Sequence, residues 1–287
     1  MPEVAEVSIT ADLLNKVMKN KTLVSFVFES GRYTKKSPKL YDEFINELPM
    51  KIISVNSKGK FMWFELKNKD GKEWTIWNSF GLTGMWSLER PINYTRVVLT
   101  LSGSSNSSIY YSDMVNYGTF KFSDNRKELD AKLKKLAPDV LKEDYSISKI
   151  QKIDKPIVKI LMDQNLIVSG IGNYLSSEIL YCSKISPYRH GTQITDSELK
   201  KLKYCMYYLS KLAYTNNQTP YVSMFYADMH KLDKYIYHPE IKLNGGVFDF
   251  KVYMKKEDPH GNAVSKAKII NTSKGARNTY WVPAVQK

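Results

Sequence analysis

The stretch Gln164-Asn-Leu-Ile-Val-Ser-Gly170-Ile-Gly172-Asn173-Tyr joins an apolar run to a segment with helical character. Two glycines one residue apart leave room for a backbone to approach a phosphate closely, as happens where a loop leads into a helix. Asn173 opens that helix with its side-chain amide and with backbone N–H donors that have no partner inside the helix. A plain tight turn would also account for the two glycines, so the interpretation depends on the rest of the chain.

The sequence on both sides of this stretch predicts a helical region that starts near residue 126. Apolar residues recur at helical spacing, and the spacing predicts helices over 128–136, 157–164, 176–182 and 197–214. Residues 215–248 look rich in loops. From 249 onward a hairpin pattern follows, with a strand beginning at Phe250-Lys-Val-Tyr-Met-Lys and a turn at Pro259-His-Gly-Asn.

The first 125 residues show a different pattern, with one helical segment followed by segments typical of strands. Residues 5–18 predict an amphipathic helix, and aromatic and β-branched segments separated by turn residues predict strands over 23–29, 51–56, 61–66, 73–80, 96–102 and 109–112. We therefore expect an α+β chain: a helix with a β-sandwich over 1–125, a helical domain over 126–248, and a terminal hairpin over 249–287.

Composition limits the class of partner. The chain has 287 residues and a net charge of +14, which favours a polyanion such as nucleic acid. It shows neither a membrane span nor a signal peptide, so we expect an intracellular, non-secreted protein. Cys182 and Cys205 have no metal-binding or redox spacing, and the sequence predicts reduced core thiols.

Two short segments near the ends of the chain could carry chemistry. In Met1-Pro2-Glu3, removal of Met1 would expose the secondary amine of Pro2, a nucleophile toward an aldehyde-like sugar carbon, with the Glu3 carboxylate one residue away. Near the other end, Lys274-Gly-Ala-Arg277-Asn-Thr-Tyr-Trp could bind backbone phosphates. Each has a simpler interpretation, because many proteins begin Met-Pro and a basic hairpin can simply be solvated.

Taken together and in order, these features resemble the formamidopyrimidine-DNA glycosylase/endonuclease VIII family of base-excision repair enzymes. The resemblance spans nearly the whole chain and rests on four matches: Pro2-Glu3-Val-Ala-Glu6 at the start, Ser57-Lys-Gly-Lys60-Phe before a strand, residues 156–178 as a helix–two-turn–helix, and Arg277-Asn-Thr-Tyr-Trp in the last hairpin.

The resemblance implies a catalytic centre at the start of the chain. The Pro2 nitrogen would attack C1′ of the damaged nucleoside, expel the base and leave a Schiff base. Glu3 would open the sugar ring by proton transfer, and Glu6 would support the site. Lys60 would join the catalytic group, and β- and δ-elimination would then cut the strand without a cofactor.

The resemblance also implies how DNA is held. Lys60, Asn173 and Arg277 would bind the phosphates around a nucleotide extruded from the duplex, because C1′ is not accessible in an intact stack. The wedge Gly81-Leu82-Thr-Gly84 would place Leu82 in the resulting gap, and Tyr117 would stack on the opposite strand. The partner would be double-stranded DNA with oxidised bases or abasic sites, bound by a monomer.

Two departures from the family pattern narrow the expectation. The family loop Asp-x-Arg-Arg-Phe-Gly reads Asp113-Met-Val115-Asn116-Tyr117-Gly118 here, so both arginines are missing. The four zinc-binding cysteine positions of the family hold other residues: His260, Ala263, Val282 and Val285. One possible ligand cannot build a tetrahedral site, so we expect no zinc and a zincless finger of the endonuclease VIII-like kind.

These departures favour oxidised pyrimidines such as thymine glycol and 5-hydroxyuracil as substrates, with hydantoins next and 8-oxoguanine after them. Two other classes of function stay open from the sequence: a non-catalytic protein that binds damaged DNA, and an RNA-binding protein of ribosomal type. The presence of both Pro2 and Glu3 favours the enzyme.

Overall fold

The computed structural model describes residues 2–103, 107–215, 246–272 and 275–287, with no side chains described for 270–277. The expected loop region at 215–248 therefore falls almost entirely outside the described residues. The described chain forms two compact units. The first contains Pro2 and Glu6–Lys134, and the second contains Glu3–Ala5, residues 135–215 and residues 246–287.

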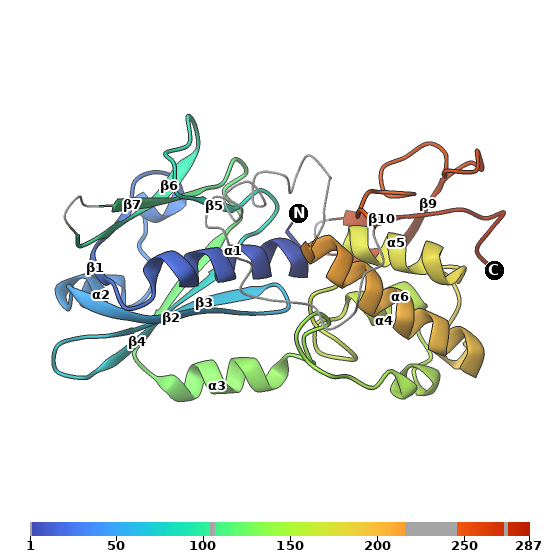
Figure 1. The fold of residues 1–287 in the computed structure, drawn as a ribbon, viewed down its shortest axis with the longest axis horizontal. Helices are drawn as coiled ribbons and strands as arrows, with labels where there is room; N and C mark the ends of the chain where they lie inside the picture. Colours follow the sequence, from blue (N-terminus) through green and yellow to red (C-terminus); the bar gives the residue numbers. More distant parts are fainter. Residues whose placement is uncertain (1, 104–106, 216–245, 273–274) are drawn as a thin grey trace. The chain divides into compact units, whose positions relative to one another are not determined.

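The first unit is built on one antiparallel sheet with the strand order β5-β7-β6-β1-β2-β3-β4-β8. The sheet bends over into a β-sandwich, with β5, β6 and β7 in one layer and β2, β3 and β4 in the other (Figure 1). Its strands are β1 (Thr22–Phe28), β2 (Met50–Lys58), β3 (Phe61–Lys67), β4 (Glu73–Ser79), β5 (Met85–Ser87), β6 (Thr95–Leu101), β7 (Ser107–Ser112) and β8 (Thr119–Ser123).

Aromatic side chains fill the space between the layers. Phe26 contacts Phe44, Phe120 and Phe122 edge to face, with ring centroids 5.2 to 6.1 Å apart. Such pairs contribute about 1 kcal/mol each beyond the area that they bury. The largest fully buried side chains of this core are Phe26, Phe44, Phe64, Trp74, Trp86, Tyr111 and Phe122.

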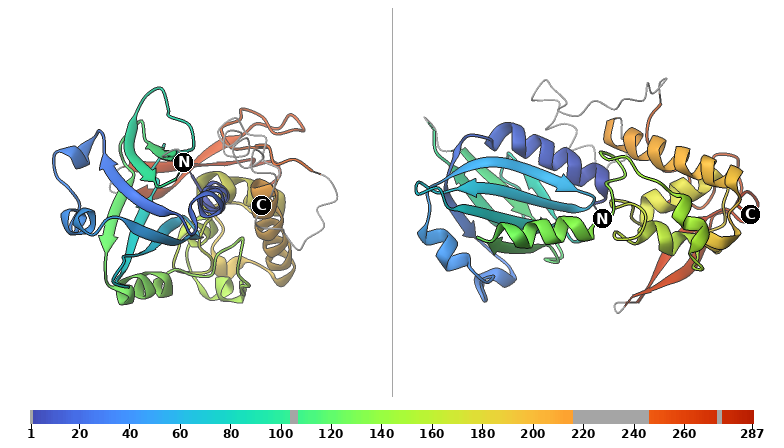
Figure 2. Two further views of the ribbon diagram at one scale, coloured as in Figure 1. Left: turned by 60° about the vertical axis from the view of Figure 1, so that its left-hand side comes forward. Right: turned by 90° about the horizontal axis from the view of Figure 1, so that it is seen from below.

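The helix α1 (Val4–Met18) lies along the β2–β3 hairpin (Figures 1 and 2). The side chain of Asn15 fixes this arrangement, since its Oδ1 accepts the N–H of Val55 at 3.0 Å. Ser8, nearer the helix start, contacts Ser57 with 3.4 Å between the hydroxyl oxygens. The hairpin therefore runs toward the N-terminal end of α1.

All six predicted strands of this unit are present near their predicted places, but the sequence did not predict the helix α2 (Tyr41–Asn46) or the strands β5 and β8. A three-residue strand such as β5 has no readable alternation. Only its pairing with β7, where Trp86 lies opposite Tyr111, makes it a strand. Two further elements are the 3-10 helix η1 (Arg32–Thr34) and the helix α3 (Arg126–Lys135).

The second unit contains the helices α4 (Ile157–Met162), α5 (Asn173–Ser183) and α6 (Asp196–Thr215), together with the hairpin β9 (Ser265–Thr272) and β10 (Gly275–Trp281). The 3-10 helices η2 (Ser148–Lys152) and η3 (Gly191–Gln193) connect them. The side chain of Gln164 holds the two turns between α4 and α5. It donates to the carbonyls of Met162 and Ile171, each at 2.9 Å, and accepts the N–H of Gly170 at 2.7 Å. No described helix is long and apolar enough to cross a bilayer.

The strand expected from residue 250 is wrong. Residues 250–255 form turns, and the hairpin begins later, at Ser265. The alternating aromatic pattern arose because Phe248, Phe250 and Tyr253 pack around Tyr174, with ring centroids 5.5 to 6.2 Å from it. Aromatic residues two or three positions apart can therefore either line one face of a strand or surround a single ring, and the sequence does not distinguish the two arrangements.

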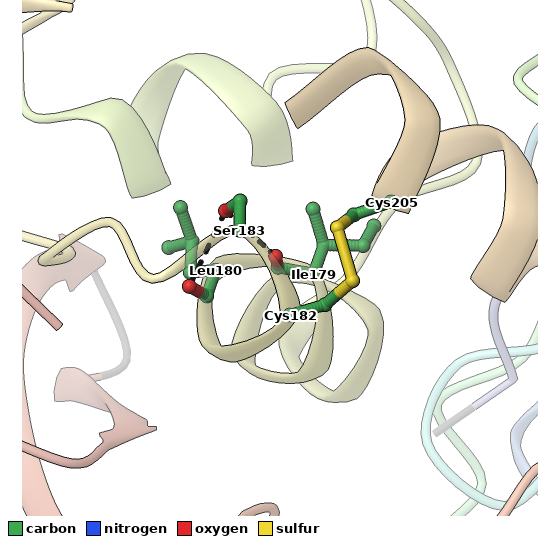
Figure 3. The surroundings of a disulfide bond; sticks show 5 residues. All are labelled: Ile179, Leu180, Cys182, Ser183 and Cys205. Carbon is green, nitrogen blue, oxygen red and sulfur yellow. Dashed lines mark hydrogen bonds between the residues drawn. A yellow bond between two sulfur atoms is a disulfide. The ribbon is translucent and has the colours of Figure 1, made fainter. Parts of the chain in front are cut away.

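The expectation of reduced thiols is also wrong, because Cys182 of α5 and Cys205 of α6 form a disulfide with their Cα atoms 6.0 Å apart (Figure 3). Cys205 is fully buried on its face of α6, and Cys182 is partly buried on its face of α5. The sequence could not show that these two faces pack together. That pairing is a result of the tertiary packing of α5 on α6.

Removing this disulfide should lower the free energy of unfolding by about 3 kcal/mol, because the bond closes a loop between residues 23 apart in sequence. Urea unfolding of the oxidised protein, compared with a Cys182→Ala/Cys205→Ala variant, measures this difference. Under a reducing agent the two proteins should differ by much less. Equal stability in oxidising buffer would contradict the prediction.

Candidate active site

The carboxylate of Glu3 is bound by the first turn of α5. Oε2 accepts the N–H of Gly172 at 2.6 Å and that of Leu175 at 3.2 Å, and Oε1 accepts the N–H of Tyr174 at 2.8 Å. These donors have no partner inside the helix, and the helix dipole favours a negative charge at this end. With only 1% of its surface exposed, Glu3 is held in one position, directly after Pro2 in the chain.

The two glycines before α5 make room for this contact. A Cβ at Gly172 would lie 2.4 Å from Cδ of Glu3, and a Cβ at Gly170 would lie 2.6 Å from Cβ of Val4. Gly170 also has a φ of 111°, which favours glycine. The sequence predicted glycines that admit a phosphate, whereas the space beside them is occupied by residues 3 and 4 of this chain.

Asn173 connects the start of α5 to β10. Its Nδ2 donates to the carbonyl of Asn278 at 2.9 Å. One turn later, the hydroxyl of Ser177 accepts the N–H of Tyr280 at 3.2 Å. The backbone of Arg277, which pairs with Ile270, therefore lies beside the residues that bind Glu3. The Oδ1 atom of Asn173 is buried and has no hydrogen-bond partner among the described residues.

Tyr253 is a member of this site that the sequence analysis missed. Burial raises the pKa of its hydroxyl, the negative charge of Glu3 raises it further, and a hydrogen bond with the Asn173 side chain lowers it. Its ring lies 5.2 Å from that of Tyr280 on β10. The available signal was the run of aromatic residues at 248–253, which was assigned to a strand.

Glu178 fixes the backbone around Tyr253. Its buried carboxylate accepts three N–H groups, from Lys251 and Val252 at 3.0 Å and from Tyr253 at 2.8 Å. Burial raises the pKa of Glu178, and these three hydrogen bonds oppose the rise. The helix α5 thus binds residue 3 with its N-terminus, β10 with Ser177 and the 251–253 turn with Glu178.

In the first unit, Pro2, Glu6 and Lys60 lie toward one end of α1. Pro2 is buried and Glu6 is fully buried. Lys60 follows Gly59 in a two-residue turn between β2 and β3, where Lys58 pairs with Phe61. Gly59 has a φ of 58°, which suits the first central position of such a hairpin turn. Because the Ser8–Ser57 contact lies just before this turn, the hairpin carries Lys60 toward the helix start.

The proposed wedge also belongs to the first unit, on two turns that contact each other. Leu82 is 41% exposed and Tyr117 is 50% exposed. The hydroxyl of Thr83 donates to Asp113, and the N–H of Gly118 donates to the same carboxylate at 2.7 Å. A Cβ at Gly81 would lie 2.8 Å from the nitrogen of Gly118, so glycine allows the turns to approach. The structure thus places Leu82 and Tyr117 on two adjoining turns with both side chains exposed.

Family models match most of the chain. The formamidopyrimidine-DNA glycosylase N-terminal domain matches residues 1–120, its H2TH domain matches 136–214, and its C-terminal domain matches 239–287. The formamidopyrimidine-DNA glycosylase of Rickettsia bellii is 30% identical over 217 residues, which cover 70% of this chain and 74% of that protein. The chain belongs to the formamidopyrimidine-DNA glycosylase family.

Other relatives and structures agree with this assignment. The Listeria monocytogenes enzyme is 25% identical over the full length of both chains. MutM bound to DNA containing carbocyclic 8-oxo-G has a TM-score of 0.76 at 20% identity over 100% of both chains. The Lactococcus lactis Fpg bound to abasic-site DNA has a TM-score of 0.75 at 20% identity over 99% of both chains. These structures share the α+β fold with its β-sandwich and helix–two-turn–helix, so the predicted fold class is confirmed.

Membership of the family also confirms the class of enzyme. The chain is a DNA glycosylase of base-excision repair with lyase activity at abasic sites. The roles of the individual site residues do not follow from the match alone, and they depend on the geometry above.

In the terminal finger, the residues at the four cysteine positions of the family pattern lie in or next to turns that hydrogen bonds hold together. Asp258 accepts the N–H groups of His260 at 2.9 Å and Asn262 at 2.8 Å, and it accepts the hydroxyl of Tyr181 at 3.0 Å. Burial alone would raise the pKa of Asp258, but the Asn262 side-chain amide, which donates to both carboxylate oxygens, and the donors named above lower it to about 2. At the other end, the side chain of Gln286 accepts the N–H of Val282 at 2.7 Å. Among the residues with described placement, no cluster of three potential ligands could hold a metal.

Proposed function

We propose that this enzyme removes oxidised pyrimidines from double-stranded DNA through a Schiff base on Pro2, followed by β,δ-elimination. The observation that supports this best is the binding of Glu3 by three N–H groups of α5, because it fixes a carboxylate immediately beside the candidate nucleophile. The geometry around Asn173, Tyr253 and the Arg277 backbone adds a candidate phosphate site to the same unit.

The proposed chemistry begins at the sugar of the damaged nucleotide. The lone pair of the Pro2 nitrogen forms a bond to C1′, while the bond between C1′ and the base breaks and the base leaves with a proton. The Glu3 carboxylate takes the proton of the attacking Pro2 amine and passes it to the ring oxygen, so that the sugar opens and the nitrogen becomes an iminium. Loss of a C2′ proton then expels the 3′ phosphate, and a second elimination expels the 5′ phosphate.

We assign to the remaining residues the roles that their matching positions in the family imply. Glu6 supports the start of α1, and Lys60 reaches the same end of the helix from its hairpin turn. Asn173 and Arg277 bind phosphates of the extruded nucleotide, and Leu82 and Tyr117 fill the gap that it leaves. We divide the chain into the catalytic domain 1–125, the helix–two-turn–helix domain 126–248 and the finger 249–287.

The preference for oxidised pyrimidines rests on the loop that lacks both arginines and on the finger that lacks cysteines. Thymine glycol and 5-hydroxyuracil are the proposed substrates, with hydantoins also accepted. The Lactococcus lactis enzyme of the same fold has been solved with DNA containing an oxidised pyrimidine, with a TM-score of 0.75. Another protein of this fold was solved with 8-oxo-G DNA, so a purine lesion is the comparison to make.

Borohydride trapping tests the proposal, because borohydride reduces a Schiff base to a stable amine. Duplexes carrying one thymine glycol, 5-hydroxyuracil, 8-oxoguanine or unmodified base are incubated with the enzyme and borohydride. We expect a covalent protein–DNA band on the two pyrimidine lesions, a weaker band on 8-oxoguanine and none on intact DNA. A band on 8-oxoguanine alone would overturn the substrate class, and no band on any lesion would overturn the mechanism.

We also propose that the finger folds without zinc, because Asp258 and Gln286 tie its turns by hydrogen bonds. Metal analysis of protein purified without chelator should find far less than one zinc per chain. Dialysis against a strong chelator should leave the unfolding temperature unchanged. One tightly bound equivalent whose removal lowers that temperature would refute the zincless finger.

A further inference from the structure

Three exposed apolar side chains project from the two turns that carry the wedge. Leu82 and Tyr117 are the two that the family pattern identifies, and Met114 is the third, with 55% of its surface exposed. Met114 is more exposed than either of the others. By contrast Val115, at the position of the first family arginine, is only half-exposed.

Hydrogen bonds explain why Met114 projects and its neighbours do not. The N–H of Val115 donates to the hydroxyl of Thr83 at 3.1 Å, which binds that residue to the wedge turn. Asn116, at the position of the second family arginine, lies against Gly31, where an added Cβ would come within 2.8 Å of its Oδ1. The direction of the loop therefore leaves Met114, like Tyr117, as an outward side chain.

Two arginines from elsewhere in the sequence hold this loop by its backbone. Arg96 of β6 donates Nε to the carbonyl of Asp113 at 2.8 Å and Nη2 to that of Met114 at 3.4 Å. Arg32 of η1 donates to the carbonyl of Gly118. The 113–118 loop lacks the two arginines of the family pattern. Its backbone carbonyls instead accept hydrogen bonds from the guanidinium groups of Arg32 and Arg96. Its two most exposed side chains are then a thioether and a phenol ring.

We propose that Met114 is a third void-filling residue, which enters the gap left by the extruded nucleotide and contacts the unpaired base of the opposite strand. This inference rests on the proposed function, because it requires extrusion from a duplex. An arginine would read that base through hydrogen bonds, whereas a thioether contacts any base by dispersion alone. Methionine is also flexible enough to fit purines and pyrimidines. Excision is therefore insensitive to the opposite base.

Single-turnover excision of 5-hydroxyuracil tests the proposal, with the lesion placed opposite each of the four bases and also in a single strand. We expect the wild type to show similar rates opposite all four bases. Met114→Ala should slow duplex excision about ten-fold, since roughly 50 Å² of apolar contact would be lost. It should leave the single-strand rate unchanged, because a single strand has no gap to fill.

Ile92→Ala is the matched control, because Ile92 belongs to the same unit, is 97% exposed and has no place in the site. It should behave as the wild type on every substrate. A second variant, Met114→Arg, would introduce a side chain that can donate hydrogen bonds to the opposite base, so its excision rates opposite the four bases should diverge.

Three other results would contradict the proposal, and each would contradict a different step of it. Duplex rates of Met114→Ala equal to those of the wild type would remove Met114 from the gap. An equal loss on duplex and single strand would show a structural role instead, and it would also overturn the inference. Absence of excision and of a trapped adduct by the wild type, even on an abasic single strand, would instead refute the proposed function and this inference with it.

Discussion

Pro2→Leu should abolish the borohydride-trapped adduct and lower glycosylase activity by at least about 10³-fold. Aminopeptidases that remove the initiator methionine require a small second residue, so Met1 stays in this variant and the nitrogen of residue 2 becomes an amide. An amide nitrogen has no available lone pair to attack C1′. Trapping on a thymine glycol duplex, together with single-turnover excision, measures the effect.

The control for Pro2→Leu is binding to an uncleavable abasic-site analogue, which should be changed much less than catalysis because the phosphate-binding residues are untouched. Pro2→Thr is the companion variant, since it keeps a small second residue and a free amine but not the secondary amine of proline. A full-strength adduct in Pro2→Leu would contradict the assignment. Lys60 would then be the next amine to test.

Gly172→Ala should strongly destabilise the second unit. Its φ of −127° is open to alanine, so the cost is one of space. The added Cβ would lie 2.4 Å from the Glu3 carboxyl carbon, and Glu3 is buried and held by three N–H donors. Displacing that carboxylate leaves the donors unsatisfied, and we expect a loss of about 3 kcal/mol in the free energy of unfolding together with most of the activity.

A double-mutant cycle separates the clash from any general effect of alanine. In a Glu3→Ala background the clashing atoms are absent, so adding Gly172→Ala should cost less than about 0.5 kcal/mol. Chemical denaturation of the four proteins gives the coupling energy. If Gly172→Ala destabilises both backgrounds equally, then the close approach of Glu3 is not what requires glycine at this position.

The helix α5 holds together the segments on which these predictions depend. Its first turn binds Glu3, its Ser177 binds β10, and its Glu178 binds the turn around Tyr253. Segments from the start and from the last part of the chain thus meet on the eleven residues of one helix. A catalytic carboxylate needs such support, because a displacement of even 1 Å lowers the rate of a positioned reaction.

Much of this protein could be predicted from sequence because it depends on local periodicity or on short motifs. Aromatic and β-branched segments between turn residues predict six of the eight strands of the sandwich, and apolar residues at helical spacing predict α6. Pro2, Glu3, Lys60, Asn173, Leu82 and Tyr117 were chosen from motif positions. The structure then places Glu3 at the start of α5, and Leu82 and Tyr117 on adjoining turns.

The tertiary structure alone decided the contacts between distant segments. The sequence showed two glycines before α5, but the group that occupies their space is Glu3 rather than a phosphate. It predicted reduced thiols in the core for Cys182 and Cys205, but the packing of α5 on α6 brings their Cα atoms to 6.0 Å and a disulfide joins them. It suggested a strand at 250–255, where aromatic residues instead surround Tyr174. Periodicity records which face of an element is apolar, and the choice of the facing partner depends on the whole fold.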